Sequence, residues 1–249
     1  MTKGRVEGFA AYGVKLIELL GLSSSAVGVR LLSGEERPAG SQALERHRYC
    51  QALMRARRGQ SVTLDSDGIA CPAAAAAFGF RPLPEGLQSG KGLVGFGIVS
   101  DPAVGRRMFE VMPRLAPGQV QRLQLFPLER AECAPDVVVV EDEVEKLMWI
   151  SLAYLHATGG ERVPSSTAVL QATCVDSTIV PYLEGHLNLS YGCYGCRDAT
   201  DLGAGEAVLG FPAAMLPSIV GHLEYLAEKA MPTSRSERAW AALVGKESA

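Results

Sequence analysis

The chain of 249 residues carries 24 Lys and Arg against 27 Asp and Glu, a formal net charge of −3 at pH 7, and 47% of its residues are hydrophobic. This balance provides no basic surface for nucleic acid or an anionic membrane, so we expect neither as a partner. The length and composition favour one compact domain over residues 1–249. Within this domain, the sequence is also compatible with two lobes, 1–120 and 121–230, followed by a C-terminal tail over 231–249.

The location that we predict is cytoplasmic. No apolar run approaches the roughly 20 residues that cross a bilayer, and Glu7, Lys15 and Glu18 interrupt the N-terminal stretch that would otherwise resemble a signal peptide. In a cytoplasmic chain, the six cysteines indicate free thiols, metal ligands or catalysis rather than a disulfide framework.

The first part of the chain predicts alternating helices and strands. Hydrophobic spacing and turn residues indicate, in order, a helix over 3–21, a buried strand over 26–32, a helix over 42–58 and a strand over 61–64. Cys50 lies inside the second helix. Cys71 precedes Pro72 and a run of alanines that ends at Ala77, which is a strong helix-start pattern. Cys71 is therefore expected at or beside the N-cap, where the helix dipole favours a thiolate.

The remaining elements predict a mixed α/β (α+β) fold. They are a short helix over 101–112, strands over 123–128 and 137–141, a helix over 142–158, a strand over 207–211 and a helix over 212–228. The strand over 137–141 is almost wholly apolar and is expected at the centre of a sheet. Gly90 to Gly95 has the letters Gly-x-Gly-x-x-Gly, but no strand precedes it, so we expect a Gly-rich strand or lid loop rather than a nucleotide site.

The order of elements contains a coarse internal echo. A strand, a helix, a glycine and then Cys71 are followed later by a strand, a helix, two glycines and then Cys174. The echo predicts two interlocked lobes around mixed sheets, related by a pseudo-twofold repeat. Such a repeat would bring Cys71 and Cys174 together at the interface of the lobes.

The Cys-x-x-Cys pair formed by Cys193 and Cys196 lies on a Gly-rich loop after a strand-like segment. Two thiols supply only half of a four-ligand site, so Cys71 and Cys174 are the expected partners. The dispersed spacing favours an iron–sulfur cluster, for example [4Fe–4S], with a redox or Lewis-acid role over a structural zinc. Cys50 could replace one ligand. Cys133, near Pro135, is expected to be an ordinary buried thiol.

Other interpretations stay open. Cys193 and Cys196 could perform dithiol redox chemistry, Cys71 could be a nucleophile, or the thiols could be buried beside a pocket for a small molecule or organic cofactor. His186 is a candidate acid/base or cofactor contact, and Arg197 could bind a carboxylate or phosphate. The expected partners are a small-molecule substrate or a redox partner. A second copy of the chain is a further candidate partner.

Several of these motifs occur together in a known family. Arg48-Tyr49-Cys50, Cys71-Pro72-Ala73, Cys174 with Asp176, the Cys193 to Arg197 segment and Val208-Leu209-Gly210-Phe211-Pro212 resemble the bacterial and archaeal domain of unknown function 169 family. The resemblance covers about residues 10 to 230. It implies no substrate, because no activity is established for that family. The family pattern supports the positions of Cys71 and Cys193 more strongly than that of Cys196.

Overall fold

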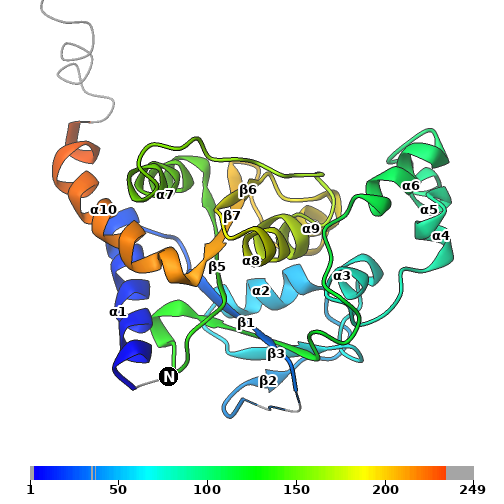
Figure 1. Cartoon of the computed structure of the whole chain (residues 1–249), viewed down its shortest axis with the longest axis horizontal. Helices are drawn as coiled ribbons and strands as arrows, with labels where there is room; N and C mark the ends of the chain where they lie inside the picture. The colour runs from blue at the N-terminus through cyan, green and yellow to red at the C-terminus, as the bar shows by residue number, and fades with distance from the viewer. Residues whose placement is uncertain (1–2, 35, 37, 234–249) are drawn as a thin grey trace, which may run out of the picture.

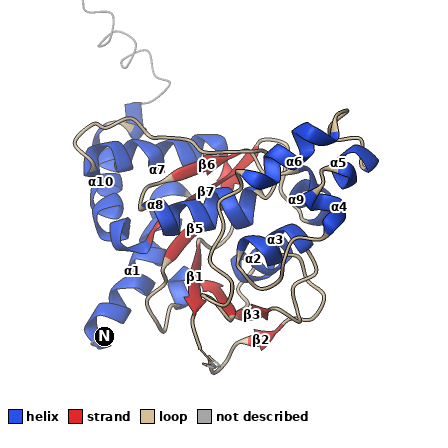
Figure 2. Cartoon of the chain, turned by 45° about the vertical axis from the view of Figure 1, so that its right-hand side comes forward, coloured by secondary structure: helices blue, strands red, loops and turns tan. Residues whose placement is uncertain are grey.

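The computed structural model describes residues 3–34, 36 and 38–233, so most of the predicted tail lies outside the described residues. The described chain contains a seven-stranded sheet in the order β2-β3-β4-β1-β5-β7-β6, with helices on both faces (Figures 1 and 2). This architecture confirms the predicted mixed α/β class. The strands are β1 (Val27–Leu32), β2 (Gln42–Ala43), β3 (Val62–Asp65), β4 (Arg122–Pro127), β5 (Val137–Glu143), β6 (Asn188–Ser190) and β7 (Glu206–Pro212).

Strand β5 separates two hydrophobic cores. Val137 and Val139 point into one core while Val138 and Val140 point into the other, as the two-residue period of a strand requires. One face carries α1 (Lys3–Leu20), α7 (Val144–Ala157) and α10 (Leu216–Lys229). The other carries α2 (Tyr49–Arg57), α3 (Pro72–Ala77), the π-helix η2 (Ala172–Ile179) and α8 (Val180–Glu184).

Three short helices project from the body beside α3 (Figure 1): α4 (Glu85–Gln88), α5 (Lys91–Gly95) and α6 (Pro102–Glu110). The segment with the Gly-x-Gly-x-x-Gly letters forms α5 rather than the expected strand or lid loop. Gly90 has a φ of 77°, and a Cβ there would lie 2.0 Å from the Pro102 carbonyl oxygen. Glycine is thus required because α5 begins directly against α6.

Apart from the edge strand β2, the described sheet consists of two equivalent three-stranded units. From the centre of the sheet outward, the first unit contains β1, β4 and β3, and the second contains β5, β7 and β6 in the corresponding places. The registers agree residue by residue, because Val27 lies opposite Pro127 as Val137 lies opposite Pro212. The middle strand of each unit, β4 or β7, ends with Phe-Pro. A 3-10 turn follows, η1 (Leu128–Arg130) after β4 and η3 (Ala213–Met215) after β7.

The same hydrogen bond closes both units. The Leu128 amide donates to the Ala26 carbonyl at 2.8 Å, and the Ala213 amide donates to the Asp136 carbonyl at 2.9 Å. Between the units, Gly28 lies opposite Val138 in the antiparallel pairing of β1 with β5. A pseudo-twofold axis perpendicular to the sheet therefore passes through this pair, as the sequence echo predicts.

The repeat places the cysteines differently from the sequence echo. Cys71 is the N-cap of the six-residue helix α3 after β3, and Cys193 is the N-cap of the six-residue helix α9 (Tyr194–Ala199) after β6. Cys50 and Cys174 each lie in the first turn of the helix before that strand. The predicted equivalence of Cys71 with Cys174 is therefore wrong. The sequence pattern made α7 the equivalent of α2 in the repeat, whereas α7 is an additional helix on the opposite face of the sheet.

Further boundaries also differ from expectation. The helix expected over 42–58 begins only at Tyr49, because Gln42 and Ala43 pair with β3 as the short strand β2. The Cys-x-x-Cys segment, expected as a loop, forms α9 despite Gly195 in its first turn. Pro212, expected to start the last helix, instead ends β7.

Candidate functional site

Five of the six cysteines line one cavity of about 440 Å³ on the face that carries α2 and α3. They come from four separate segments: α2, the N-cap of α3, η2 and the start of α9. They are Cys50, Cys71, Cys174, Cys193 and Cys196. Cys133 lies elsewhere, half-buried, with its Sγ 3.7 Å from the Gln124 side-chain oxygen. All four predicted ligands and the predicted substitute Cys50 are thus brought to one cavity.

The rest of the cavity wall is mainly apolar. The projecting helices and their connections contribute Leu87, Leu93, Phe96, Ile98 and Phe109. The charged residues that line the cavity among those described are Arg48 and Asp198. The side chains of Phe96 and Tyr194 each remain 69% exposed, although both residues border the cavity. The cavity therefore has a thiol-rich floor and an apolar wall.

Cys193 and Cys196 are in direct contact. Their Sγ atoms are 2.8 Å apart, well beyond the roughly 2.05 Å of a disulfide. The Cys196 amide donates to Cys193 Sγ at 3.1 Å, which is the N-cap interaction that a thiol can make in place of an oxygen. Cys196 Sγ also lies 3.3 Å from the Thr173 hydroxyl oxygen.

The environment of these thiols opposes ionisation when no metal is bound. The hydrogen bond with Cys196, followed by burial, raises the pKa of Cys193. The hydrogen bond with Cys193 lowers the pKa of Cys196, but its contact with Cys50 and burial outweigh this and raise the pKa to about 12. Burial also raises the pKa of Cys174. Dithiol redox enzymes need the opposite, a lowered pKa, although the strand–Cys-x-x-Cys–helix order is the one they use.

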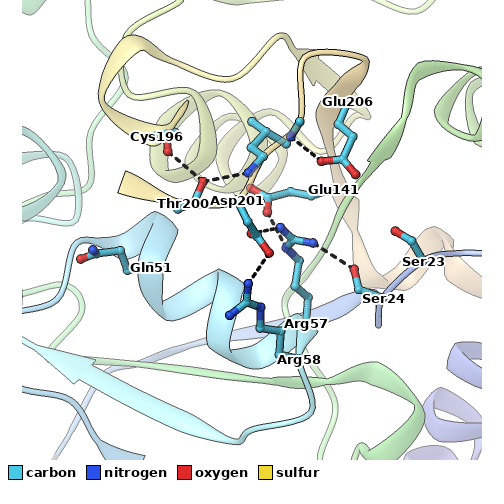
Figure 3. Close-up of polar contacts among 12 residues, drawn as sticks. Ser23, Ser24, Gln51, Arg57, Arg58, Glu141, Cys196, Thr200, Asp201 and Glu206 are labelled. Carbon is cyan, nitrogen blue, oxygen red and sulfur yellow. Dashed lines mark hydrogen bonds and ion pairs between the residues drawn. The ribbon is translucent and has the colours of Figure 1, made fainter. Parts of the chain in front are cut away.

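Helix α9 is held against α2 along its whole length. Arg48 Nη1 donates to the Gly195 carbonyl at 2.9 Å, and Gln51 donates to the Ala199 carbonyl at 3.3 Å. Beyond the end of α9, Asp201 forms ion pairs with Arg57 and Arg58 of α2 and its C-terminal end (Figure 3). Cys193 and Cys196 are thereby fixed in position relative to Cys50.

Arg57 also forms an ion pair with the buried carboxylate of Glu141. Its Nε lies 3.0 Å from Glu141 Oε2 (Figure 3). Both side chains are almost completely inaccessible. Burial raises the pKa of Glu141 to about 7, although the Arg57 charge acts in the opposite direction. Glu141 does not line the cavity. Its ion pair with Arg57 instead anchors α2 to β5.

The π-helix η2 positions Cys174. Asp176 accepts hydrogen bonds from the Thr167 hydroxyl at 2.7 Å and from the Ser190 hydroxyl at 2.8 Å. Burial raises the pKa of Asp176 to about 6. The N-cap of η2 is Gln171, whose positive φ of 58° is unusual for a residue other than glycine. Such π-helical turns are frequent at functional sites, and Gln171 itself lines the cavity.

The two other predicted contacts lie outside the cavity. Arg197 donates to the carbonyls of Tyr191, Gly203 and Glu206 and so ties together the loops around α9. His186 lies 2.7 Å from Glu184 Oε2 through Nε2 and 2.9 Å from the Leu187 carbonyl through Nδ1. Neither residue is among those that line the cavity.

The sequence provided weaker signals for several cavity residues. Arg48 and Tyr194 lie one or two residues from a cysteine in the motifs, and this proximity was the only sequence signal that they belong to the site. Gln171 and the apolar residues of α4–α6 carried no recognisable pattern, because the cavity forms only when segments distant in the chain come together. Within the described ranges, no three or more His, Cys, Asp or Glu side chains are arranged to hold a metal ion as they stand.

The comparisons with known proteins identify a family. The chain belongs to DUF169, a family described as uncharacterised ArCR, whose model matches residues 15–222. No curated protein matches the chain, and neither does any solved structure. Among the residues that the structure describes, no helix combines the length and apolarity needed to cross a membrane.

Proposed function

We propose that the chain binds an iron–sulfur cluster in the cysteine-lined cavity and acts in a redox or Lewis-acid role on a small molecule or redox partner. The observation that carries this proposal is the convergence of five of the six cysteines, from four chain segments, on one cavity. Buried thiols that served only as small hydrophobic residues would have no reason to meet in this way. Cys71, Cys174, Cys193 and either Cys196 or Cys50 would supply the ligands.

The local chemistry supports a thiolate ligand at Cys193. Its sulfur accepts a backbone hydrogen bond at 3.1 Å, and such bonds tune cluster potentials. A bound metal would deprotonate thiols that are otherwise held neutral by burial. Cluster binding is favoured over a single zinc ion, because a cluster spreads its thiolates over several irons whereas zinc draws all four sulfurs to about 2.3 Å from one centre.

A second function is favoured by the apolar wall. A cavity of about 440 Å³ with few polar groups suits a small organic ligand, whether or not a cluster occupies its floor. In this alternative the cysteines are buried thiols and the purified protein is colourless. A Cys71 nucleophile has less support, since no histidine that could activate it lines the cavity among the described residues.

Anaerobic purification followed by visible absorption, iron, zinc and sulfide analysis tests the proposal. We expect sulfur-to-iron charge-transfer absorption with matching iron and sulfide, in the purified protein or after reconstitution with ferrous iron and sulfide. Cys193→Ser should lose the bound iron, whereas Cys133→Ser, outside the cavity, should retain it. Equal iron in both variants, or a wild-type protein that stays colourless after reconstitution, would refute cluster binding and favour the organic-ligand alternative.

A further inference from the structure

Arg48 brings a positive charge to the apolar cavity without a carboxylate to balance it. The residue directly precedes α2, is half-buried and lines the cavity. One of its N–H groups donates to the Gly195 carbonyl at 2.9 Å, which holds the guanidinium in place. Among the described residues no Asp or Glu forms an ion pair with Arg48, whereas Arg57 of the same helix pairs with both Glu141 and Asp201. A guanidinium carries several N–H donors, so a ligand in the cavity can use those that Gly195 does not.

Asp198, the other charged residue among the described ones that line the cavity, favours a ligand with a single negative charge. Its side chain is exposed, whereas Arg48 is half-buried and held by its backbone bond. The Asp198 carboxylate repels a dianion, such as a phosphate monoester, more strongly than a monocarboxylate. The neighbouring thiols add no charge, because burial of Cys174 and the hydrogen bond of Cys193 with Cys196 raise the pKa of each.

The wall opposite the thiols suits an apolar body. It is formed by residues of α4–α6 and of the segments beside them: Leu87, Leu93, Phe96, Ile98 and Phe109. The Phe96 side chain is 69% exposed, so an apolar ligand in the cavity would remove aromatic surface from water. The volume of about 440 Å³ is within the range of small-molecule sites.

We propose that the cavity binds a monocarboxylate with an apolar body, the carboxylate on Arg48 and the body against the wall that α4–α6 supply. A guanidinium and a carboxylate form strong, often bidentate hydrogen bonds. Arg197, the carboxylate contact expected from the sequence, donates instead to three backbone carbonyls outside the cavity. The inference rests on the organic-ligand function proposed above, whose ligand class it names, and it does not require a bound cluster.

Isothermal titration calorimetry of the full chain with hexanoate, octanoate and the neutral octanamide tests the ligand class, before any treatment with iron and sulfide. We expect octanoate to bind about tenfold more tightly than octanamide, because hydrogen bonds between charged groups are the stronger ones. Octanoate should also bind roughly 15-fold more tightly than hexanoate, because it buries two more CH₂ groups. Equal affinities for octanoate and octanamide, or no binding of octanoate, overturn the proposal.

Arginine variants test the position of the carboxylate. Arg48→Gln should weaken octanoate binding about tenfold and leave octanamide binding unchanged, whereas Arg48→Lys retains the charge and should retain part of the preference. Arg81→Gln is the matched control, because Arg81 lines a second cavity of about 560 Å³ and also donates to one backbone carbonyl, that of Ile69. Wild-type octanoate binding by Arg48→Gln, or its loss in Arg81→Gln, contradicts the assignment to Arg48.

Thiol alkylation locates the ligand in the wild-type protein, so the test stands even if Arg48→Gln folds poorly. Cys71 and Cys133 are both half-buried, but of these two only Cys71 lines the cavity. Saturating octanoate should slow the reaction of Cys71 with iodoacetamide several-fold and leave that of Cys133 unchanged, as measured by peptide mass spectrometry. An unprotected Cys71 means that octanoate binds elsewhere and overturns the inference. Octanoate binding without iron uptake refutes the cluster alone, and iron uptake without octanoate binding refutes this inference alone.

Discussion

The two units share the same three-stranded arrangement and differ in the segments that connect its strands. Both place a helix before the outer strand and a six-residue, cysteine-capped helix after it. The first unit delivers Cys50 and Cys71 to the cavity, and the second delivers Cys174, Cys193 and Cys196. The first unit inserts residues 78–121, including α4–α6, before β4, while the second passes from α9 to β7 through residues 200–205. The common frame therefore carries the thiols, and the insertion in one unit supplies the apolar wall.

The packing of the helix on the sheet is the second difference. In the first unit α2 is a regular α-helix over β4, whereas in the second η2 is a π-helix over β7. The register makes Gly210 equivalent to Leu125. At Gly210 the Ser177 carbonyl approaches so closely that a Cβ would lie 1.8 Å from its oxygen. The second unit therefore holds its helix nearer to the sheet than a side chain would permit.

The largest effect that we expect concerns the equivalent N-caps. Cys71→Ala and Cys193→Ala should each abolish cluster uptake, because each removes one of the proposed thiolate ligands from an equivalent N-cap. Iron and sulfide analysis after anaerobic reconstitution measures this loss, with Cys133→Ala as the matched control. Unequal behaviour, with cluster retained in one of the two N-cap variants, would break the equivalence of the units.

A large loss of stability is expected from Gly210→Ala. The new methyl group would overlap the Ser177 carbonyl, so we expect a decrease of about 3 kcal/mol in the free energy of unfolding. Urea denaturation monitored by circular dichroism measures it. Gly205→Ala is the control, since nothing lies within 4 Å of a Cβ at that position. Similar midpoints for the two variants would show that η2 can move away from the sheet.

The sequence was most informative where one segment determines its own structure. The valine run over 137–140 predicts the central strand, and Pro72 followed by alanines predicts α3 with Cys71 at its N-cap. The relation between the cysteines could not be predicted in the same way. It depends on strand order, and α7 resembles α2 in sequence pattern although it lies on the other face.

Long-range contacts explain the remaining differences. The helix α9 forms although Gly195 disfavours it, because Arg48 and Gln51 hydrogen-bond to its carbonyls from α2. The cavity wall combines residues from segments far apart in the chain, so no local pattern announces it. The close approach of η2 to the sheet likewise requires Gly210, which lies more than thirty residues after the start of η2.

A pH effect distinguishes the strand positions Glu141 and Leu31, which the repeat makes equivalent. Burial raises the pKa of Glu141 from 4.5 to about 7, so the folded protein binds this proton more tightly than the unfolded chain. The contribution of Glu141 to stability therefore falls as pH rises from 4.5 to 7, by an amount on the order of 3 kcal/mol.

Glu141→Gln removes that proton and leaves Arg57 paired with Asp201. The free energy of unfolding of the wild type minus that of the variant should therefore decrease across this pH window, as measured by urea denaturation at a series of pH values. Subtracting the variant cancels the contribution of Asp176, whose pKa is also raised. A pH-independent difference would mean that the Arg57 charge keeps Glu141 ionised throughout.

The smallest effect concerns a bond that joins the two units. The hydroxyl of Tyr49 in α2 lies 2.8 Å from the Thr178 hydroxyl in η2, and Thr178 donates in turn to the Thr173 carbonyl at 2.9 Å. Tyr49 is therefore the donor to Thr178, and Tyr49→Phe should cost about 1 kcal/mol of unfolding free energy in urea. Tyr194→Phe, at a side chain that is 69% exposed, is the control and should cost nothing measurable. A Tyr49→Phe protein as stable as this control would mean that packing alone, without the hydroxyl bond, holds α2 and η2 together across the pseudo-twofold axis.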